Sequence, residues 1–552
     1  MRPDQARVVI DSTLREQGFL LTTGICPTYT GQISVHGSPV DVRLEIPDAR
    51  FVNRPRVHLI NRDQIPLDVL AHIEIETGIC YASAAGLPFD NAKPGEAILR
   101  VLREAEKTLE RSYRGQGAAE MADEYQHYWK GLAILSLLGS TLEPGTHEAF
   151  LCSASRDDAK AVLLSRSATI NGWPVEDEVL SALVFSTRGR IGPGKSIVPP
   201  TDLPSLEAWW AEQAALSDIP WNTVEKALLN RKIGFIFSAN ALVGFSIKRP
   251  PKIRAGLKSG TIRLSAVPKL LAAMKGSLEL ERWNVVDASL ERITSRNAIY
   301  PARLAECRIA LIGCGTIGSH LARTLIQSGA GLGEPFYLFD TDKVSPGNLG
   351  RHLLNFADIG KNKAEALARE LQRFHPDVSV LPFAADAVQS WSSLKGCDLI
   401  IDATGDWNVQ TALNELFLED RGTKLGALLH SWVFGNGVGA QSFLNLGDDK
   451  ACFRCLRPDF AGQWRYPAAQ NGIVTQFMPA SCGDGTYAAF SVDAPVIAAS
   501  LSLRSAIDWS RGEPGARLRT VAVDPIGGRH QPPKSPEPVA GCPACASFRE
   551  TA

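Results

Sequence analysis

The chain has 552 residues, of which 45% are hydrophobic and 21% are charged, and its 58 Lys and Arg against 59 Asp and Glu leave a formal net charge of -1. This length predicts roughly two to four domains of a globular protein, and the balanced charge argues against direct nucleic-acid binding. The sequence shows neither a signal-peptide core nor an apolar run of membrane-spanning length, so we expect a cytoplasmic protein with no membrane partner.

The first predicted domain covers residues 1–125 and mixes helices with strands. The stretch DQARVVIDSTLREQ favours a helix, and VDVRLEI alternates apolar and polar positions as a half-buried strand does. RVHLIN is a second strand candidate, and EAILRVLREAEKTLERSY has apolar residues along one helical face. The long irregular segment between that strand and that helix contains His72 and Cys80, and long loops in compact domains often carry function.

The middle region, residues 126–300, has a weaker pattern. Turn-rich breaks such as GRIGPGKSIVPPTDLPS separate the strand-like FIFSANALVGFSI from the helical SLEAWWAEQAALS, which indicates a folded α/β domain. The basic run from Lys248 to Arg263 is interpreted as an exposed connecting segment, with contact to a partner as the alternative. The residues of this region assign it no chemistry.

Residues 301–552 show the clearest fold pattern. The apolar runs CRIALIG, PFYLFD, VSVLPF and CDLIIDAT alternate with the helical stretches GSHLARTLIQSG and GKNKAEALARELQRF. Strands that alternate with helices predict a parallel, doubly wound, Rossmann-like sheet. Ligands of such sheets bind at the carboxyl ends of the strands.

The stretch IALIGCGTIGSHLA places a glycine turn between the first of these strands and a helix. Gly313, Gly315 and Gly318 provide a tight turn, a close backbone approach and helix packing, and the helix start attracts phosphate. Asp340, at the end of the next strand, is placed to accept ribose hydroxyls. A nicotinamide or flavin dinucleotide, another phosphate ligand and a turn without a ligand all remain open at this point.

The polar residues that follow separate these possibilities. The stretch DTDKVSPGNLGRHLLNFADIGKNKAEA brings polar and cationic residues toward the mouth of the loop, namely Asp342, Asn348, Arg351 and Lys363. A triphosphate attacked at its α-phosphorus needs such cations, because they stabilise the charge on the departing pyrophosphate. Asp406, after a later strand, is a candidate ligand for Mg²⁺. The set favours ATP over a dinucleotide.

The motifs GCGTIGS, DTD, NLGR, GKNKA and DATGD resemble the ubiquitin-activating superfamily, which includes the bacterial adenylyltransferases of thiamine and molybdopterin biosynthesis. The resemblance implies that Asp340 binds the ribose of ATP and that Asp406 coordinates Mg²⁺. It also implies phosphate contacts from Asn348, Arg351 and Lys363. The family usually carries its aspartate directly after the threonine, whereas Gly405 intervenes here.

The same resemblance bears on assembly. Members of this superfamily often dimerise and borrow an arginine from the partner subunit. The stretch LERITSRNAIY, with Arg292 and Arg296, lies about where that arginine is found. A homodimer is therefore expected.

Eleven cysteines are present, and four of them form the pairs CFRC and CPAC, which are Cys452 with Cys455 and Cys542 with Cys545. Two such pairs predict a closed tetrahedral Zn²⁺ site, with redox pairs or chance as the alternatives. Cys314 and Cys397 are expected to be packing residues.

Cys482 lies between the two pairs, in MPASCGDGTY. By resemblance to ubiquitin-activating enzymes, this is the loop where the adenylated carboxylate is captured as a thioester. A thiolate suits this step because it is nucleophilic near neutral pH and AMP leaves easily. An unreactive loop cysteine is the alternative.

Cys80, in AHIEIETGICYAS, closes a sequence of helix, strands, His and Gly-x-Cys before a long helix. This order resembles a ubiquitin-conjugating enzyme, whose cysteine receives the carrier protein by transthiolation. Those enzymes carry His-Pro-Asn where this chain has His-Ile-Glu, starting at His72. His72 is either a structural or a catalytic histidine, and a buried core cysteine is the alternative for Cys80.

A conjugating-like domain ahead of an activating-like domain resembles the bacterial fusion proteins that accompany cGAS-like nucleotidyltransferases in CBASS antiphage operons. The resemblance implies a degenerate adenylation-like middle domain that aids dimerisation. It also implies that the C-terminus of the nucleotidyltransferase is adenylated, passed to Cys482 and Cys80, and joined to an acceptor amine, which is expected to be a lysine.

Three other functions remain open. The first is a biosynthetic adenylyltransferase that activates a sulfur carrier or peptide, with an N-terminal domain that only recognises partners. The second is a scaffold that binds ATP without turnover, against which the set Asn348, Arg351 and Lys363 argues. The third is a nicotinamide oxidoreductase.

Overall fold

The structure is a computed structural model that describes residues 2–22, 26–67, 70–74, 78–81, 88–114, 116–137, 144–153, 160–164, 180–194, 198–230, 232–420, 426–479 and 486–548. The described residues up to Asp287 form one compact unit, and those from Ala288 onward form a second. Within this described part, no helix has the length and apolar character that a bilayer crossing requires.

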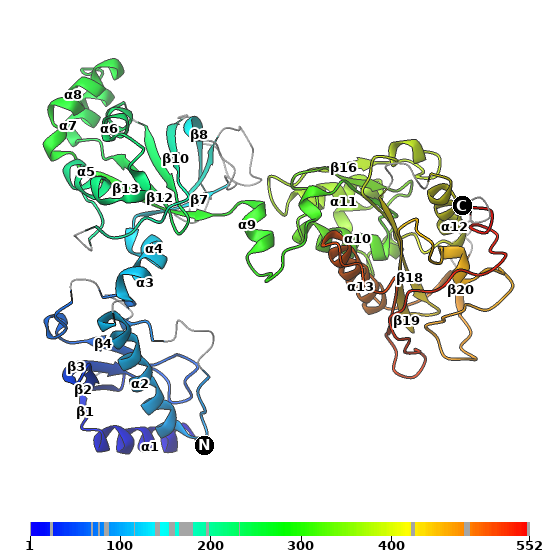
Figure 1. The fold of residues 1–552 in the computed structure, drawn as a ribbon, viewed down its shortest axis with the longest axis horizontal. Coiled ribbons are helices and arrows are strands. Elements are labelled where there is room, and N and C mark those ends of the chain that lie inside the picture. Colours follow the sequence, from blue (N-terminus) through cyan, green and yellow to red (C-terminus); the bar gives the residue numbers. More distant parts are fainter. Residues whose placement is uncertain are drawn as a thin grey trace. The chain divides into compact units, whose positions relative to one another are not determined.

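The first unit opens with a four-stranded antiparallel sheet (Figure 1). Its strands, in order, are β1 (Leu20–Thr22), β2 (Thr28–Val35), β3 (Ser38–Glu45) and β4 (Arg56–Leu59). The helices α1 (Pro3–Glu16) and α2 (Pro94–Tyr113) pack with this sheet around one core. The alternation predicted for VDVRLEI is confirmed, because Val40, Val42 and Leu44 of β3 are all buried.

Three short pieces lie between β4 and α2. They are the 3₁₀ turn η1 (Arg62–Gln64) and the strands β5 (Ile73–Glu74) and β6 (Gly78–Ile79), which pair with each other. After α2 come two further helices, α3 (Gly117–Asp123) and α4 (Tyr125–Trp129). These pieces contain the residues that surround Cys80.

A closed barrel completes the first unit. Its strands run in the order β10 (Leu180–Ser186), β11 (Ile233–Phe237), β12 (Leu242–Ile247), β13 (Leu280–Asp287), β7 (Leu132–Ser136), β9 (Lys160–Leu164) and β8 (Gly145–Ser153). The accompanying helices are α5 (Leu203–Glu212), η2 (Ala214–Leu216), α6 (Trp221–Leu229), α7 (Pro251–Lys258), η3 (Leu264–Ala266), α8 (Val267–Ala273) and η4 (Lys275–Ser277).

The helix and strands predicted from SLEAWWAEQAALS and FIFSANALVGFSI are confirmed as α5, β11 and β12. The interpretation of Lys248 to Arg263 as a connecting segment is wrong, because α7 lies inside it. Ile253 and Gly256 are the buried residues of α7, and Ile253 belongs to the aromatic core beneath the barrel. The basic side chains of α7 therefore lie on the exposed side of a helix that packs against the core.

The second unit contains the predicted doubly wound sheet. Its strands run in the order β16 (Val380–Phe383), β15 (Phe336–Phe339), β14 (Ile309–Ile312), β17 (Leu399–Asp402), β18 (Ala427–Phe434), β19 (Gly439–Asn445) and β22 (Leu518–Ala522). The first five are parallel, and β19 is antiparallel to both of its neighbours. The chain order reverses direction at β14, so a crevice opens beside the end of that strand.

Helices cover both faces of this sheet, as Figure 1 shows for α10 and α13 on one side and α12 on the other. Ile309 and Leu311 of β14 pack with α10 (Thr316–Gln327), α11 (Lys363–Gln372) and α13 (Asp493–Ser510). Ala310 and Ile312 face the opposite core with α12 (Trp407–Glu419). A strand buried on both faces accounts for the unbroken apolar run in the sequence.

The remaining elements of the second unit are short. They are α9 (Leu290–Ser295), η5 (Leu304–Glu306), η6 (Pro346–Asn348), η7 (Phe356–Asp358), η8 (Trp391–Ser393), η9 (Phe453–Leu456), β20 (Phe477–Pro479) and β21 (Thr486–Ala488). The last two pair as an antiparallel ribbon. We call this pair of strands the β20–β21 arm.

Candidate functional site

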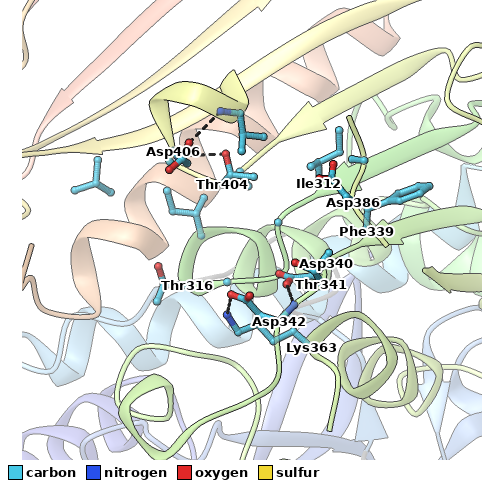
Figure 2. A pocket seen from close by; sticks show the side chains of 18 of the residues that line it. Ile312, Thr316, Phe339, Asp340, Thr341, Asp342, Lys363, Asp386, Thr404 and Asp406 are labelled. Atoms are coloured by element: carbon cyan, nitrogen blue, oxygen red, sulfur yellow. Dashed lines mark hydrogen bonds and ion pairs between the residues drawn. The ribbon is translucent and has the colours of Figure 1, made fainter. Parts of the chain in front are cut away.

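A cavity of about 600 Å³ lies at the carboxyl ends of the parallel strands. Residues that follow β14, β15, β16, β17 and β18 line it, and Ala488 and Phe490 at the end of the β20–β21 arm complete the wall. Figure 2 shows Asp340 with Asp342 and Lys363 on one side of this cavity, Asp406 beside Thr404 on another, and Asp386 apart from both. The cavity occupies the crevice that the topology predicts.

The glycine turn forms the floor of this cavity. Gly313 has a φ of 86°, and a Cβ atom at Gly318 would lie 1.8 Å from the carbonyl oxygen of Gly313, so both positions require glycine. A Cβ atom at Gly315 would meet nothing within 4 Å, and Gly315 lines the cavity just before α10 begins at Thr316. The turn therefore leaves open space in front of a helix start, where anions are favoured.

Asp340 lines the cavity and is fixed by the backbone around it. Its Oδ2 accepts the N–H of Cys314 at 2.7 Å and its Oδ1 accepts the N–H of Asp342 at 2.8 Å. Burial raises the pKa of this carboxyl group. Each oxygen keeps a lone pair for a further donor, such as a hydroxyl of a ligand.

Asn362 organises the same corner and was not predicted from the sequence. Its side-chain amide donates to the carbonyl oxygens of Asp340 at 2.8 Å and Asp342 at 3.2 Å. Its oxygen accepts the N–H of Glu365 and caps α11. An Asn directly before a helical pattern is a known N-cap signal, so this residue was accessible from GKNKAEA.

Lys363 begins α11, and its ammonium group lies 2.8 Å from a carboxylate oxygen of Asp342. The Lys363 side chain is only 12% exposed, whereas that of Asp342 is 67% exposed. Both residues line the cavity. A nearly buried cation on the cavity wall is suited to bind a phosphate that enters there.

Asn348 and Arg351 are not among the residues that line the cavity. The Asn348 side-chain oxygen accepts from the N–H and the hydroxyl of Ser345 and closes η6. The Arg351 guanidinium lies over the rings of Phe490, at 4.6 Å, and Tyr487, at 5.7 Å. Arg351 therefore contacts the wall of the cavity through the residues that end the β20–β21 arm.

The opposite wall carries Asp406, whose Oδ1 accepts the N–H of Val409 at 3.0 Å and caps α12. Gly405 has a φ of 66°, a left-handed conformation that lets the additional residue form a turn before Asp406. Across the part of the chain that the structure describes, the second carboxylate oxygen of Asp406 makes no hydrogen bond. That second oxygen is therefore available as a ligand of the kind that Mg²⁺ prefers.

A buried pair supports that wall from below. His430 Nδ1 lies 2.8 Å from Oδ2 of Asp402, and both side chains are fully buried. The other oxygen of Asp402 accepts the Thr404 hydroxyl at 2.7 Å, and Thr404 in turn accepts the N–H of Asp406. The pair joins two strands that are distant in sequence, so no local pattern indicated it.

The predicted thioester cysteine, Cys482, lies outside the described residues, as do all residues between β20 and β21. The base of the arm is described. Asn436 donates to the carbonyl oxygens of Gln476 and Ala489, both at 2.8 Å, and accepts the N–H of Gln476 at 2.7 Å. One side chain therefore holds both strands of the arm next to Gly435, which lines the cavity.

Cys80 lies in the first unit and is exposed, directly after β6. Its N–H donates to the carbonyl oxygen of His72 at 2.7 Å. The next residue, Tyr81, is buried, and its hydroxyl donates to the carbonyl oxygen of Pro55 at 2.6 Å. Burial raises the pKa of Tyr81 to about 12. An exposed thiol on a backbone that is fixed by hydrogen bonds is well placed to act as a nucleophile.

The four predicted metal ligands meet in one cluster. The sulfur atoms of Cys452 and Cys455 lie 3.8 Å apart, those of Cys452 and Cys542 3.8 Å, and those of Cys455 and Cys545 3.5 Å. All four side chains are buried, and their sulfur atoms lie within 4.8 Å of one another. A tetrahedral zinc site with bonds of about 2.3 Å requires sulfur separations of about 3.8 Å. The cluster therefore fits a structural Zn²⁺ ion.

We expect Cys545→Ser to remove this ion. Purified chain should contain about one zinc per molecule, and the variant should contain far less and melt at least about 10 °C lower. Cys397→Ser is the matched control, because Cys397 is also buried but stands apart from the cluster. It should lose some stability and keep its zinc. Equal zinc content in both variants by atomic emission would contradict the assignment.

The other predicted residues are placed as follows. Cys314 and Cys397 are buried, which confirms them as packing residues, and burial raises the pKa of Cys397 to about 11. Arg292 lies on α9 and Arg296 directly follows it, and both are exposed.

Two family models match this chain. Residues 293–520 match the ThiF family, and residues 8–136 match the Prokaryotic E2 family B. The first match contains the cavity, and the second contains Cys80. The two matched segments do not overlap.

Relatives that match over most of this chain are also found. A protein of Pseudomonas aeruginosa (strain BWHPSA011 / Pa011) named ATP-dependent ubiquitin transferase-like protein Cap2 is 27% identical over 530 residues, covering 93% of this chain and 92% of the relative. A protein of the same name from Escherichia coli (strain TW11681) is 25% identical and covers 78% of each chain. The solved structure of E. coli MccB with MccA-N7isoASN aligns with a TM-score of 0.34 at 18% identity, over 47% of this chain and 68% of that one.

Proposed function

Because this chain is a bacterial fusion of an E2-like conjugating domain with a ThiF-like activating domain, we propose that it activates the C-terminal carboxylate of a protein with ATP and conjugates that protein to an amine. The observation that carries the proposal is the cavity at the strand ends, where the open glycine turn, Asp340 and Lys363 meet. A chain with both domains has the two reactive centres that activation and transfer require.

The first step is adenylation. A carboxylate oxygen of the substrate protein attacks the α-phosphorus of ATP, an acyl-adenylate forms, and the bond to pyrophosphate breaks. Asp340 accepts the ribose hydroxyls, the glycine turn receives the phosphates, and Lys363 stabilises the charge that develops on them. Asn348 and Arg351 assist at the phosphates, and Arg351 reaches them by leaving the rings of Tyr487 and Phe490.

Transfer follows in three acyl exchanges. The Cys482 thiolate attacks the acyl carbon and AMP leaves, and the Cys80 thiolate then takes the acyl group and releases Cys482 as a thiolate. Finally, a lysine amine attacks the Cys80 thioester, an amide forms, the amine gives up a proton and the thiolate leaves. The exposed position of Cys80 supports its role as the last carrier.

Two metals belong to the proposal. A bound Mg²⁺ supplies charge neutralisation at the triphosphate, and Asp406 is the residue of this chain that holds it. The four clustered cysteines hold Zn²⁺, which links the segment after β19 to the end of the chain. The zinc has a structural role, because four thiolates leave no coordination position for a substrate.

The partners complete the proposal. The substrate protein is a cGAS-like nucleotidyltransferase and the acceptor is a protein lysine, a choice supported by the resemblance of the domain order to CBASS fusion proteins. The active form is a homodimer to which one subunit contributes Arg292 or Arg296. The exposure of both arginines supports this, as do the 89% and 73% exposed side chains of Ile299 and Tyr300.

The test is exchange of radiolabelled pyrophosphate into ATP. We expect exchange that depends on both the chain and a candidate substrate protein with a free C-terminus, and no exchange when that C-terminus is amidated or truncated. Exchange without any carboxylate substrate, or none with any nucleotidyltransferase from a neighbouring gene, would contradict the proposal.

A further inference from the structure

The two-stranded ribbon of β5 and β6 brings His72 opposite Cys80. Ile73 pairs with Ile79 and Glu74 with Gly78, so the next position in this antiparallel register places His72 beside Cys80. The N–H of Cys80 completes the ladder with a hydrogen bond of 2.7 Å to the His72 carbonyl oxygen. The backbone position of Cys80 therefore depends directly on the backbone of His72.

His72 has an unusual conformation. Its φ is 62°, in the left-handed region that residues other than glycine rarely adopt. Such a conformation persists only when the surroundings hold it in place. The candidates for that restraint are the hydrogen bond to Cys80 and the contacts of the imidazole ring.

The imidazole ring is buried between two carboxylates. Its Nδ1 lies 2.8 Å from Oε1 of Glu124, its Nε2 lies 3.3 Å from Oε2 of Glu120, and the His72 side chain is only 10% exposed. Glu120 belongs to α3 and Glu124 directly follows it, so both come from the segment after α2. They reach across from a part of the chain distant in sequence from the ribbon.

The charged groups around the ring favour its protonated form. Glu124 and Glu120 raise the pKa of His72, with the contact to Glu124 as the largest cause, while burial and Arg111 oppose them. Arg111, on α2, is also paired with Glu120, at 3.3 Å. A protonated ring between two carboxylates forms a charged clamp on the ribbon.

We propose that Glu120 and Glu124 are positioning residues for Cys80, which act by holding His72 and, through its carbonyl oxygen, the backbone that presents the thiol. This inference rests on the proposed role of Cys80 as the thioester carrier. It assigns a part in the transfer step to the segment that follows α2.

The clamp predicts a specific pH dependence of acyl transfer to Cys80. Its contribution is complete while His72 is protonated in both the folded and the unfolded chain, and it is lost as the pH rises through the raised pKa of folded His72. The thiolate fraction of Cys80 increases over the same range. Transfer to Cys80 should therefore rise with pH and then level off or fall when His72 loses its proton.

The experiment compares Glu124→Gln and Glu120→Gln with Glu110→Gln in the full chain. Glu110 is the matched control because it pairs with Arg114, at 3.7 Å, on the solvent side of α2. Single-turnover transfer to Cys80 is measured between about pH 6 and 9, together with pyrophosphate exchange and the His72 pKa from NMR of labelled histidine. We expect transfer near pH 7 to fall about tenfold in Glu124→Gln, a lower His72 pKa, and unchanged pyrophosphate exchange.

Further variants decide the cause. Glu124→Asp keeps the charge and should recover transfer to within about threefold of the parent chain, whereas Glu110→Gln should behave as the parent does. The proposal is overturned if the His72 pKa falls in Glu124→Gln and Glu120→Gln while transfer is unchanged, or if Glu124→Asp is as slow as Glu124→Gln. If the parent chain itself shows no pyrophosphate exchange with ATP and a substrate protein, the proposed function is refuted instead.

Discussion

Lys363→Ala should reduce pyrophosphate exchange by about 100- to 1000-fold, the loss found when one preorganised charged donor is removed from a transition state. The Lys363 side chain is 12% exposed, and it is the only cationic side chain among the described residues that line the cavity. The variant should fold normally, because its partner Asp342 is 67% exposed and becomes solvated when the lysine is gone.

Lys361→Ala is the matched control for this variant. Lys361 lies two positions earlier and pairs with Asp358 at 3.1 Å, and it is absent from the cavity wall. Its exchange rate should stay within about twofold of the parent chain. If Lys363→Ala retained more than about a third of the parent rate, the phosphate site would be wrongly assigned.

Much of the second unit followed from local sequence patterns. The apolar runs predicted four of the five parallel strands, because strands such as β14 and β17 are buried at every position and carry no polar alternation. Gly313 and Gly318 marked the turn, because the first has a positive φ and a side chain at the second would meet the backbone. The cysteine pairs predicted the cluster because two knuckles of this spacing are a typical four-thiolate metal site. These features depend on neighbours in the sequence.

The missed features depend on contacts between distant segments. The barrel was not predicted because β7 pairs with β9 and β13, and β10 with β8 and β11, and such registers leave no local mark. The pair of His430 with Asp402 and the contacts of His72 with Glu120 and Glu124 are of the same kind. Asn436, which holds the base of the β20–β21 arm, lies between two glycines. An Asn is common in such turns for conformational reasons alone, so the sequence did not indicate its contacts with the arm.

Cys80→Ala should abolish the final conjugate and leave pyrophosphate exchange unchanged. The alanine removes the only atom of this residue that can form a thioester, whereas adenylation uses residues of the second unit. Because Cys80 is exposed, the substitution should change the free energy of unfolding by no more than about 0.5 kcal/mol, so a lost conjugate reports on chemistry. Mass spectrometry with ATP and substrate should find a thiol-sensitive adduct on Cys80 in the parent chain only.

Two further variants distinguish a carrier from a recognition domain. Cys80→Ser should accumulate an oxygen ester that resists thiol reagents, since a serine hydroxyl accepts the acyl group slowly and releases it poorly. Cys26→Ala is the control, because Cys26 is a half-buried cysteine of the same unit whose sulfur donates to the carbonyl oxygen of Pro27 at 3.8 Å. Full conjugation by Cys80→Ala would show that the relay ends at the activating domain, as in an adenylyltransferase whose N-terminal domain only recognises partners.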